Sequence, residues 1–150
     1  MKIVRAGDQF VFRLGKEEQA LFWELLQLYP CISGSHLRGS GGRTADSSQG
    51  LLEEALAQQR SENKQLLQAF LSGRCRLEHT DKGTNFSVSQ AEFEWLLQIL
   101  NEVRVGSWIL LGSPEEKLEM KLLDDRSAPH FWAMEMAGHF EMQMLSALNE

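Results

Sequence analysis

An alternating apolar pattern around a short turn near the start of the chain constrains the fold more than any other feature. Gly7-Asp8 is a two-residue turn that tolerates positive φ, and strand-forming residues flank it on both sides. This turn sets Ile3 opposite Phe12 and gives the hairpin one apolar face. Because two strands alone are only marginally stable in water, we expect helices to cover that face. Its side chains are Ile3, Phe10, Phe12 and Leu14.

Five further segments carry apolar residues at helical spacing. They are residues 16–29, 51–71, 89–111, a short segment at 114–124, and 128–148. The second of these is apolar at both ends and polar in its middle, which suits a helix that packs at its ends and faces solvent between. Residues 75–88 predict a second hairpin, with its turn at 81–83. The sequence therefore predicts an α+β fold, mostly helical, with about five helices and two small β-hairpins in a single domain over residues 1–150.

The helix that begins after Ser89 has the strongest local start signal. Ser89 and Glu92 have the spacing of a capping box, and Val88 and Phe93 have that of a hydrophobic staple. Gly106 is a weak point inside this helix, because glycine has low helix propensity. The short helix is predicted to begin with Ser113 as its N-cap.

Residues 33–50 differ in composition from the rest of the chain. They are rich in glycine and serine, and such a segment buries too little apolar area to offset its loss of conformational entropy. We therefore expect a mobile loop. Two interpretations stay open: a solvated insertion, or a loop that contacts a partner through His36, Arg38 and Arg43.

The charge balance excludes several classes of protein. The chain of 150 residues has 15 lysines and arginines against 21 acidic residues, a formal charge of −6. Nucleic-acid binding needs clustered basic residues to neutralise phosphates, so it is disfavoured. No apolar run approaches the roughly 20 residues of a membrane span, and the first residues form no apolar h-region, so we expect neither a membrane span nor a secretory signal. Cys31 and Cys75 fit reduced thiols, so we expect a soluble cytoplasmic protein that binds neither nucleic acid nor membrane.

Motifs of catalysis and metal binding are missing from the sequence. It contains no Gly-x-Ser-x-Gly elbow, phosphate-binding Walker loop, dinucleotide fingerprint or His-Glu-x-x-His helix. Cys75 and His79 lack the two further ligands that a zinc site requires. The sequence therefore predicts no metal, no cofactor and no enzymatic activity.

Asn101, Arg104 and Trp108 are the most unusual residues of the predicted 89–111 helix, because they form a polar stripe next to its apolar face. An arginine there needs an anionic partner, since an unpaired charge away from water is costly. Asp124, Asp125 or a glutamate of the last helix are candidates for that partner. Two interpretations follow: an internal ion pair that fixes helix packing, or a recognition site that uses Arg104 and Trp108.

The same helix carries a family resemblance. Residues 94–104, EWLLQILNEVR, resemble the Trp-Leu…Leu-Asn-(Asp/Glu)-Leu-Arg signature of a bacterial family of unknown function. Residues 5–18 are similar to the family's N-terminal hairpin and helix, and residues 128–133 to its closing Ala-Pro segment. The sequence departs from the family at Val103, in the Gly/Ser-rich loop and in its Met-rich last helix. The family is best known from actinobacteria, where its gene often lies beside that of the ClpS adaptor. The resemblance thus implies a link to Clp-dependent proteolysis and transfers no catalytic residue.

These observations lead to one leading hypothesis and two others. The leading one is a non-enzymatic interaction or regulatory protein with a protein partner, linked through the resemblance to the Clp adaptor system. The alternative is a small-ligand-binding protein or enzyme with a pocket around Asn101, Arg104, Trp108 and Trp132. The third is a homodimer, suggested by the surplus of aromatic and methionine residues on the last helix.

Overall fold

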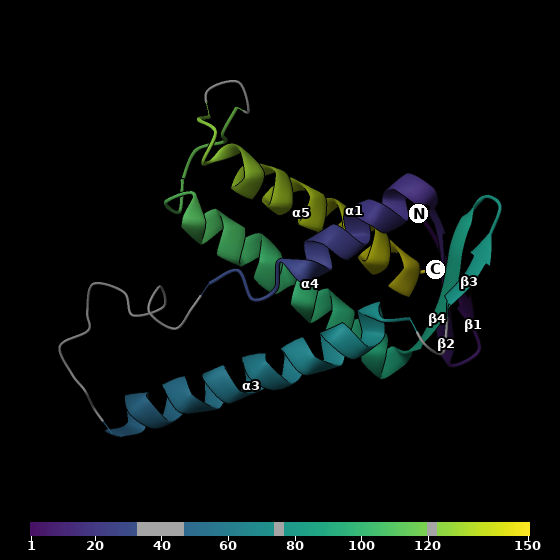
Figure 1. Cartoon of the computed structure of the whole chain (residues 1–150), viewed down its shortest axis with the longest axis horizontal. Helices are drawn as coiled ribbons and strands as arrows, with labels where there is room; N and C mark the ends of the chain where they lie inside the picture. Colours follow the sequence, from purple (N-terminus) through teal and green to yellow (C-terminus); the bar gives the residue numbers. More distant parts are fainter. Residues whose placement is uncertain (33–46, 74–76, 120–122) are drawn as a thin grey trace.

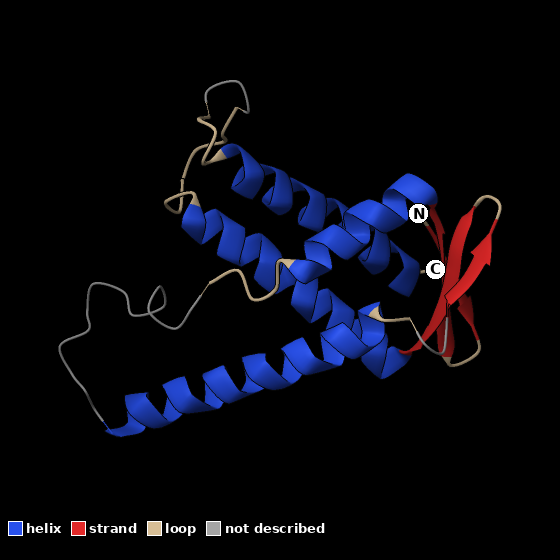
Figure 2. Ribbon diagram, in the orientation of Figure 1, coloured by secondary structure: helices blue, strands red, loops and turns tan. Residues whose placement is uncertain are grey.

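An antiparallel sheet and a group of helices on one of its faces make up the structure (Figure 1). The computed structural model describes residues 1–32, 47–73, 77–119 and 123–150. In Figure 2 the sheet stands at one end of the molecule and the helices extend away from it. The elements, in chain order, are β1 (Lys2–Ala6), β2 (Gln9–Gly15), α1 (Lys16–Gln27), α3 (Ser47–Leu71), β3 (Leu77–Thr80), β4 (Gly83–Ser89), α4 (Gln90–Leu110) and α5 (Ala128–Leu148).

The sheet has the strand order β1-β2-β4-β3, with every neighbouring pair antiparallel. The register of the first hairpin is confirmed, because Ile3 pairs with Phe12 across β1 and β2. The two predicted hairpins are not separate units. They join where β2 pairs with β4, which sets Phe12 opposite Phe86.

Aromatic side chains from the sheet and the helices fill the core. The predicted apolar face of the first hairpin is buried. Phe10 stacks on Phe93 of α4 at 4.1 Å between ring centroids, and Phe12 stacks on Phe86 at 4.7 Å. Such pairs each contribute about 0.5–1.5 kcal/mol beyond the area that they bury. Helices α1, α4 and α5 therefore cover the sheet as the apolar face of the hairpin requires.

The helix starts that the sequence predicts are present in α4 and α5. The Ser89 hydroxyl accepts a hydrogen bond from the Glu92 amide at 3.2 Å, and the Glu92 carboxylate accepts one from the Ser89 amide at 2.8 Å. Ser127 is the N-cap residue of α5, with proline in its first turn. In the ranges given above, no helix is both long and apolar enough to cross a membrane.

The predicted short helix at 114–124 is wrong over the part of it that is described. Residues 113–119 form no helix, so the described chain has four helices rather than about five. Ser113 has a φ of 52°, whereas N-cap residues typically have negative φ in the β region. The Trp108 indole also donates a hydrogen bond to the Pro114 carbonyl at 3.1 Å, which folds this segment back against α4.

The predicted loop at 33–50 lies mostly outside the described residues, which exclude 33–46. Residues 47–50 belong to α3, so the predicted loop is too long at its C-terminal end. The helix-forming run from Leu51 onward therefore extends back to residue 47.

Candidate functional site

Asn101 and Arg104 lie together on the exposed side of α4. The Arg104 guanidinium donates from Nη2 to the Asn101 side-chain oxygen at 2.8 Å and from Nε to Glu141 Oε1 of α5 at 3.3 Å. The partner is thus a glutamate of the last helix, one of the predicted candidates. Asp124, another candidate, instead accepts a hydrogen bond from the Ser127 amide at the start of α5.

The ion pair between Arg104 and Glu141 is asymmetric in its exposure. The side chain of Arg104 is 45% exposed and that of Glu141 only 13%. Burial raises the pKa of Glu141, and the attraction of Arg104 lowers it by less. The stem of Arg104 also lies against Gly138, where an added Cβ would be 3.4 Å from Arg104 Cδ. The pair therefore joins α4 to α5 while leaving the guanidinium open to solvent on one side.

The two predicted tryptophans do not join this pair in a common pocket. Trp108 is 39% exposed and is held by the Pro114 carbonyl. Trp132 is partly buried and packs against the core from α5. Of the four predicted site residues, the structure brings Asn101 and Arg104 into contact.

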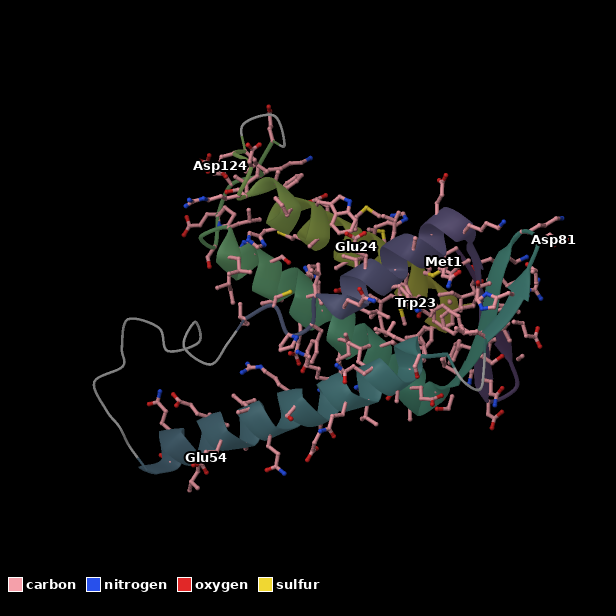
Figure 3. The ribbon with its side chains drawn as sticks, in the orientation of Figure 1. Met1, Trp23, Glu24, Glu54, Asp81 and Asp124 are labelled. Atoms are coloured by element: carbon pink, nitrogen blue, oxygen red, sulfur yellow. The ribbon has the colours of Figure 1, made fainter. Side chains whose placement is uncertain are left out.

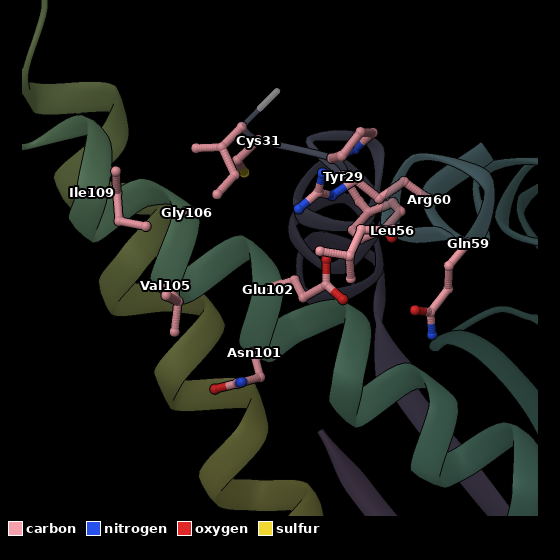
Figure 4. Close-up of a pocket in the computed structure, with 12 residues that line it drawn as sticks. Tyr29, Cys31, Leu56, Gln59, Arg60, Asn101, Glu102, Val105, Gly106 and Ile109 are labelled. Atoms are coloured by element: carbon pink, nitrogen blue, oxygen red, sulfur yellow. The ribbon is translucent and has the colours of Figure 1, made fainter. Parts of the chain in front are cut away.

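A pocket of about 210 Å³ lies on the other side of Asn101, between α3 and α4 (Figure 4). We call it the α3–α4 groove. Three segments that are distant in sequence line it: residues 29–32 after α1, Leu56 to Arg60 of α3, and Asn101 to Ile109 of α4. The full lining is Tyr29, Pro30, Cys31, Ile32, Leu56, Gln59, Arg60, Asn101, Glu102, Val105, Gly106 and Ile109.

The apolar end of the groove depends on a close approach at Gly106. A Cβ at this position would lie 2.8 Å from the Cβ of Cys31, nearer than two such carbons approach. Only glycine therefore lets the segment at 29–32 lie directly on α4. The Cys31 thiol donates a hydrogen bond to the Val103 carbonyl of α4, with 3.7 Å between the sulfur and the oxygen. This contact brings Ile32 beside α4, and both Ile32 and Ile109 line the groove.

The polar end of the groove lies beside Asn63, the side chain that attaches α3 to the rest of the molecule. The Asn63 amide donates a hydrogen bond to the Tyr29 hydroxyl at 3.2 Å and accepts one from the Trp95 indole at 3.2 Å. Leu67 is buried just beyond, and Phe70 meets the Trp95 ring edge-on at 6.3 Å. These contacts fix the C-terminal half of α3 on the body of the molecule, and the groove opens on the N-terminal side of them.

Opposite charges face each other at the polar end. Arg60 of α3 and Glu102 of α4 both line the groove near Tyr29 (Figure 4). The pKa of Tyr29 is raised, mainly because the side chain is buried. The hydrogen bond from Asn63 opposes this effect. Of the two charged neighbours, Glu102 raises the pKa of Tyr29 and Arg60 lowers it. The groove thus has an apolar end and an end with one positive and one negative group.

The described lining of the groove contains a thiol but no histidine. Burial raises the pKa of the Cys31 thiol, which keeps it protonated and unreactive at neutral pH. Within the described ranges, no three histidine, cysteine or acidic side chains gather as metal ligands do. Cys75, which the sequence does not favour as a metal ligand together with His79, lies outside those ranges.

Sequence reasoning missed most of the groove. Gly106 has low helix propensity, but that property gives no sign of the segment that approaches it. Asn63 lies in the polar middle of α3, and nothing local distinguishes it from the solvent-facing residues around it. The one signal in the sequence is its spacing: Asn63 lies at helical intervals from Leu56, Leu67 and Phe70, which places it on the same side of the helix as these apolar residues.

Comparison with known proteins finds no protein-family model, no curated protein and no solved structure that matches this chain.

Proposed function

We propose that this protein is a non-enzymatic cytoplasmic interaction or regulatory protein that binds a segment of a partner protein in the α3–α4 groove. The observation that supports this proposal most is the size of the groove. Pockets for small molecules usually measure about 300–1,000 Å³. A groove of about 210 Å³ accommodates one or two large apolar side chains. Anchor side chains of that kind carry most of the binding energy at protein interfaces.

The composition of the groove supports the same proposal. Apolar walls from Leu56, Val105 and Ile109 suit a leucine or phenylalanine anchor. The Asn101 and Gln59 amides at the edge offer both donors and acceptors to the backbone of a bound segment. The protonated Cys31 thiol and the lack of an acid–base pair in the groove favour binding over catalysis.

The family resemblance suggests the first partners to test. It implies a link to Clp-dependent proteolysis, so we propose the ClpS adaptor and the Clp ATPase as candidate partners. Immobilised wild-type protein should retain one of them at micromolar concentration. The Ile109→Asp variant should lose it, because a carboxylate in an apolar wall opposes burial of the anchor.

A matched control separates the groove from the rest of the surface. Leu145 is 49% exposed on α5 and does not line the groove, so Leu145→Asp adds the same charge elsewhere. We expect this variant to retain the partner as the wild type does. Equal retention by both variants would place the interaction outside the groove, and no reproducible partner for the wild type would contradict the proposal as a whole.

One observation favours the alternative of a small-ligand site or enzyme. Asn101 lines the groove and also binds Arg104, so a ligand in the groove has a path to the guanidinium. A thermal-shift screen against small carboxylates and phosphates tests this alternative. Stabilisation that is lost in Asn101→Ala would favour it over the protein-binding function.

A further inference from the structure

One flank of α3 carries exposed leucines that do not line the groove. Leu51, Leu52 and Leu66 are 68%, 59% and 58% exposed, among the most exposed large apolar residues of the described chain. Figure 1 shows α3 along one edge of the molecule, and in Figure 3 its N-terminal half, including Glu54, stands clear of the other elements. An exposed apolar stripe of this kind marks an interaction surface.

The stripe follows a heptad spacing. Six exposed residues recur at alternating intervals of three and four, the a and d positions of a coiled coil. Residues at these positions lie on one side of a helix, so the six form one continuous strip. We call it the α3 stripe: Leu52, Ala55, Gln59, Glu62, Leu66 and Ala69.

Two copies of the α3 stripe are complementary to each other when the helices run antiparallel. In an antiparallel pair of α3 helices, a positions face d positions, so Leu52 of one copy faces Ala69 of the other and Leu66 faces Ala55. A large residue then meets a small one in each apolar layer, which lets the helices approach closely. In the central layers the Gln59 amide faces the Glu62 carboxylate, a donor opposite an acceptor.

A parallel pair has none of these matches. Each residue then faces itself, so Glu62 opposes Glu62 and the alanines oppose alanines. Like charges in one layer destabilise the pair, and facing alanines leave space unfilled. The order of residues in the stripe therefore selects the antiparallel arrangement.

We propose that this protein forms an antiparallel homodimer through the α3 stripe. The α3 stripe shares only Gln59 with the lining of the α3–α4 groove, so the dimer is an interaction beyond the proposed function. A helix of 25 residues is about 38 Å long, and pairing one face of it buries less than a standard interface. The dimer is accordingly weak and depends on concentration in the micromolar range.

Sedimentation equilibrium from low micromolar to several hundred micromolar concentration tests the proposal. Wild-type protein should shift from monomer to dimer over this range. Leu66→Asp should remain a monomer, while Leu145→Asp on α5 should dimerise as the wild type does. A wild type that stays monomeric throughout, or a Leu66→Asp variant that dimerises normally, would overturn the proposal.

Two substitutions at Gln59 test the direction of the helices. In the antiparallel pair, Gln59→Lys faces Glu62 of the other copy and should tighten the dimer several-fold, while Gln59→Glu should weaken it several-fold. In a parallel pair both changes place like charges opposite each other and weaken the dimer. Residue 59 is exposed, so both variants should fold, which circular dichroism checks. Weakening by Gln59→Lys would overturn the antiparallel pairing.

Discussion

The Cβ of Cys31 lies 2.8 Å from the point that a Cβ on Gly106 would occupy. This relationship holds the segment after α1 against the C-terminal part of α4 and so forms one wall of the α3–α4 groove. It also reverses the usual effect of a glycine in a helix, because here the missing side chain stabilises the packing.

Gly106→Ala should therefore destabilise the protein. Alanine favours the helix by about 1 kcal/mol, but its Cβ collides with a carbon next to the backbone, and such overpacking costs about 1–3 kcal/mol. Urea denaturation should show a net loss of unfolding free energy.

Gly50→Ala is the matched control for that measurement. Nothing lies within 4 Å of a Cβ at Gly50, which is also in a helix, so this change should stabilise by about 0.5–1 kcal/mol. A stabilising Gly106→Ala would show that the close approach to Cys31 is absent in solution.

Removal of the Asn63 amide should loosen α3. Asn63→Ala leaves the Tyr29 hydroxyl and the Trp95 indole without this partner, at a cost of about 1–3 kcal/mol. Amide hydrogen exchange should become faster along α3 before it does in α4. Gln68→Ala, an exposed change on the same helix, should leave exchange as it is, and equal effects of the two variants would refute a special role for Asn63.

The pair of Arg104 and Glu141 predicts a pH-dependent effect. Because burial raises the pKa of Glu141 in the folded state, this carboxyl contributes stability below its unfolded pKa and loses that contribution as pH rises through the folded value. Arg104→Gln removes the attraction that offsets the burial, so the folded pKa should rise further.

The variant should therefore lose stability at neutral pH, where Glu141 is charged, by about 1 kcal/mol for a half-exposed pair. The loss should vanish near pH 3.5, below the ordinary glutamate pKa. Denaturation at both pH values, with the exposed Arg126→Gln as a control, measures the difference. An equal loss at both would mean that Arg104 acts through packing on Gly138 alone.

A buried threonine gives a fourth prediction. The Thr84 hydroxyl donates to Gln19 Oε1 at 2.6 Å and contacts His79 Nδ1 at 3.1 Å, which links β4 to α1 and β3. Thr84→Val should cost about 1–3 kcal/mol, because the Gln19 oxygen loses its donor. Adding Gln19→Leu should recover part of the loss in a double-mutant cycle, and a purely additive cycle would contradict the link.

Local signals predicted the elements of this fold well. The capping box at Ser89 and the two-residue turn at Gly7-Asp8 act within a few residues of themselves, so a single sequence is enough to find them. The start at Ser113 failed for a local reason as well: the chain leaves α4 through positive φ angles at Gly112 and Ser113, which are not typical of N-cap residues.

Long-range relationships had no such signal. Nothing in either hairpin specifies that β2 pairs with β4, and the choice of Glu141 over Asp124 as the partner of Arg104 depends on how α4 and α5 cross. The groove is assembled from three segments, and its wall at Cys31 exists only because α4 has a glycine 75 positions later in the sequence. Tertiary contact, rather than local propensity, determines these features.

Site-specific photocrosslinking in cells tests the central claim, that the α3–α4 groove binds a partner protein. A benzophenone amino acid replaces Ile109 in the groove or, as a control, Leu145 on α5. We expect a discrete crosslinked protein, other than a second copy of this chain, from position 109 and none from position 145. No crosslink from position 109, or the same crosslinked proteins from both positions, would contradict it.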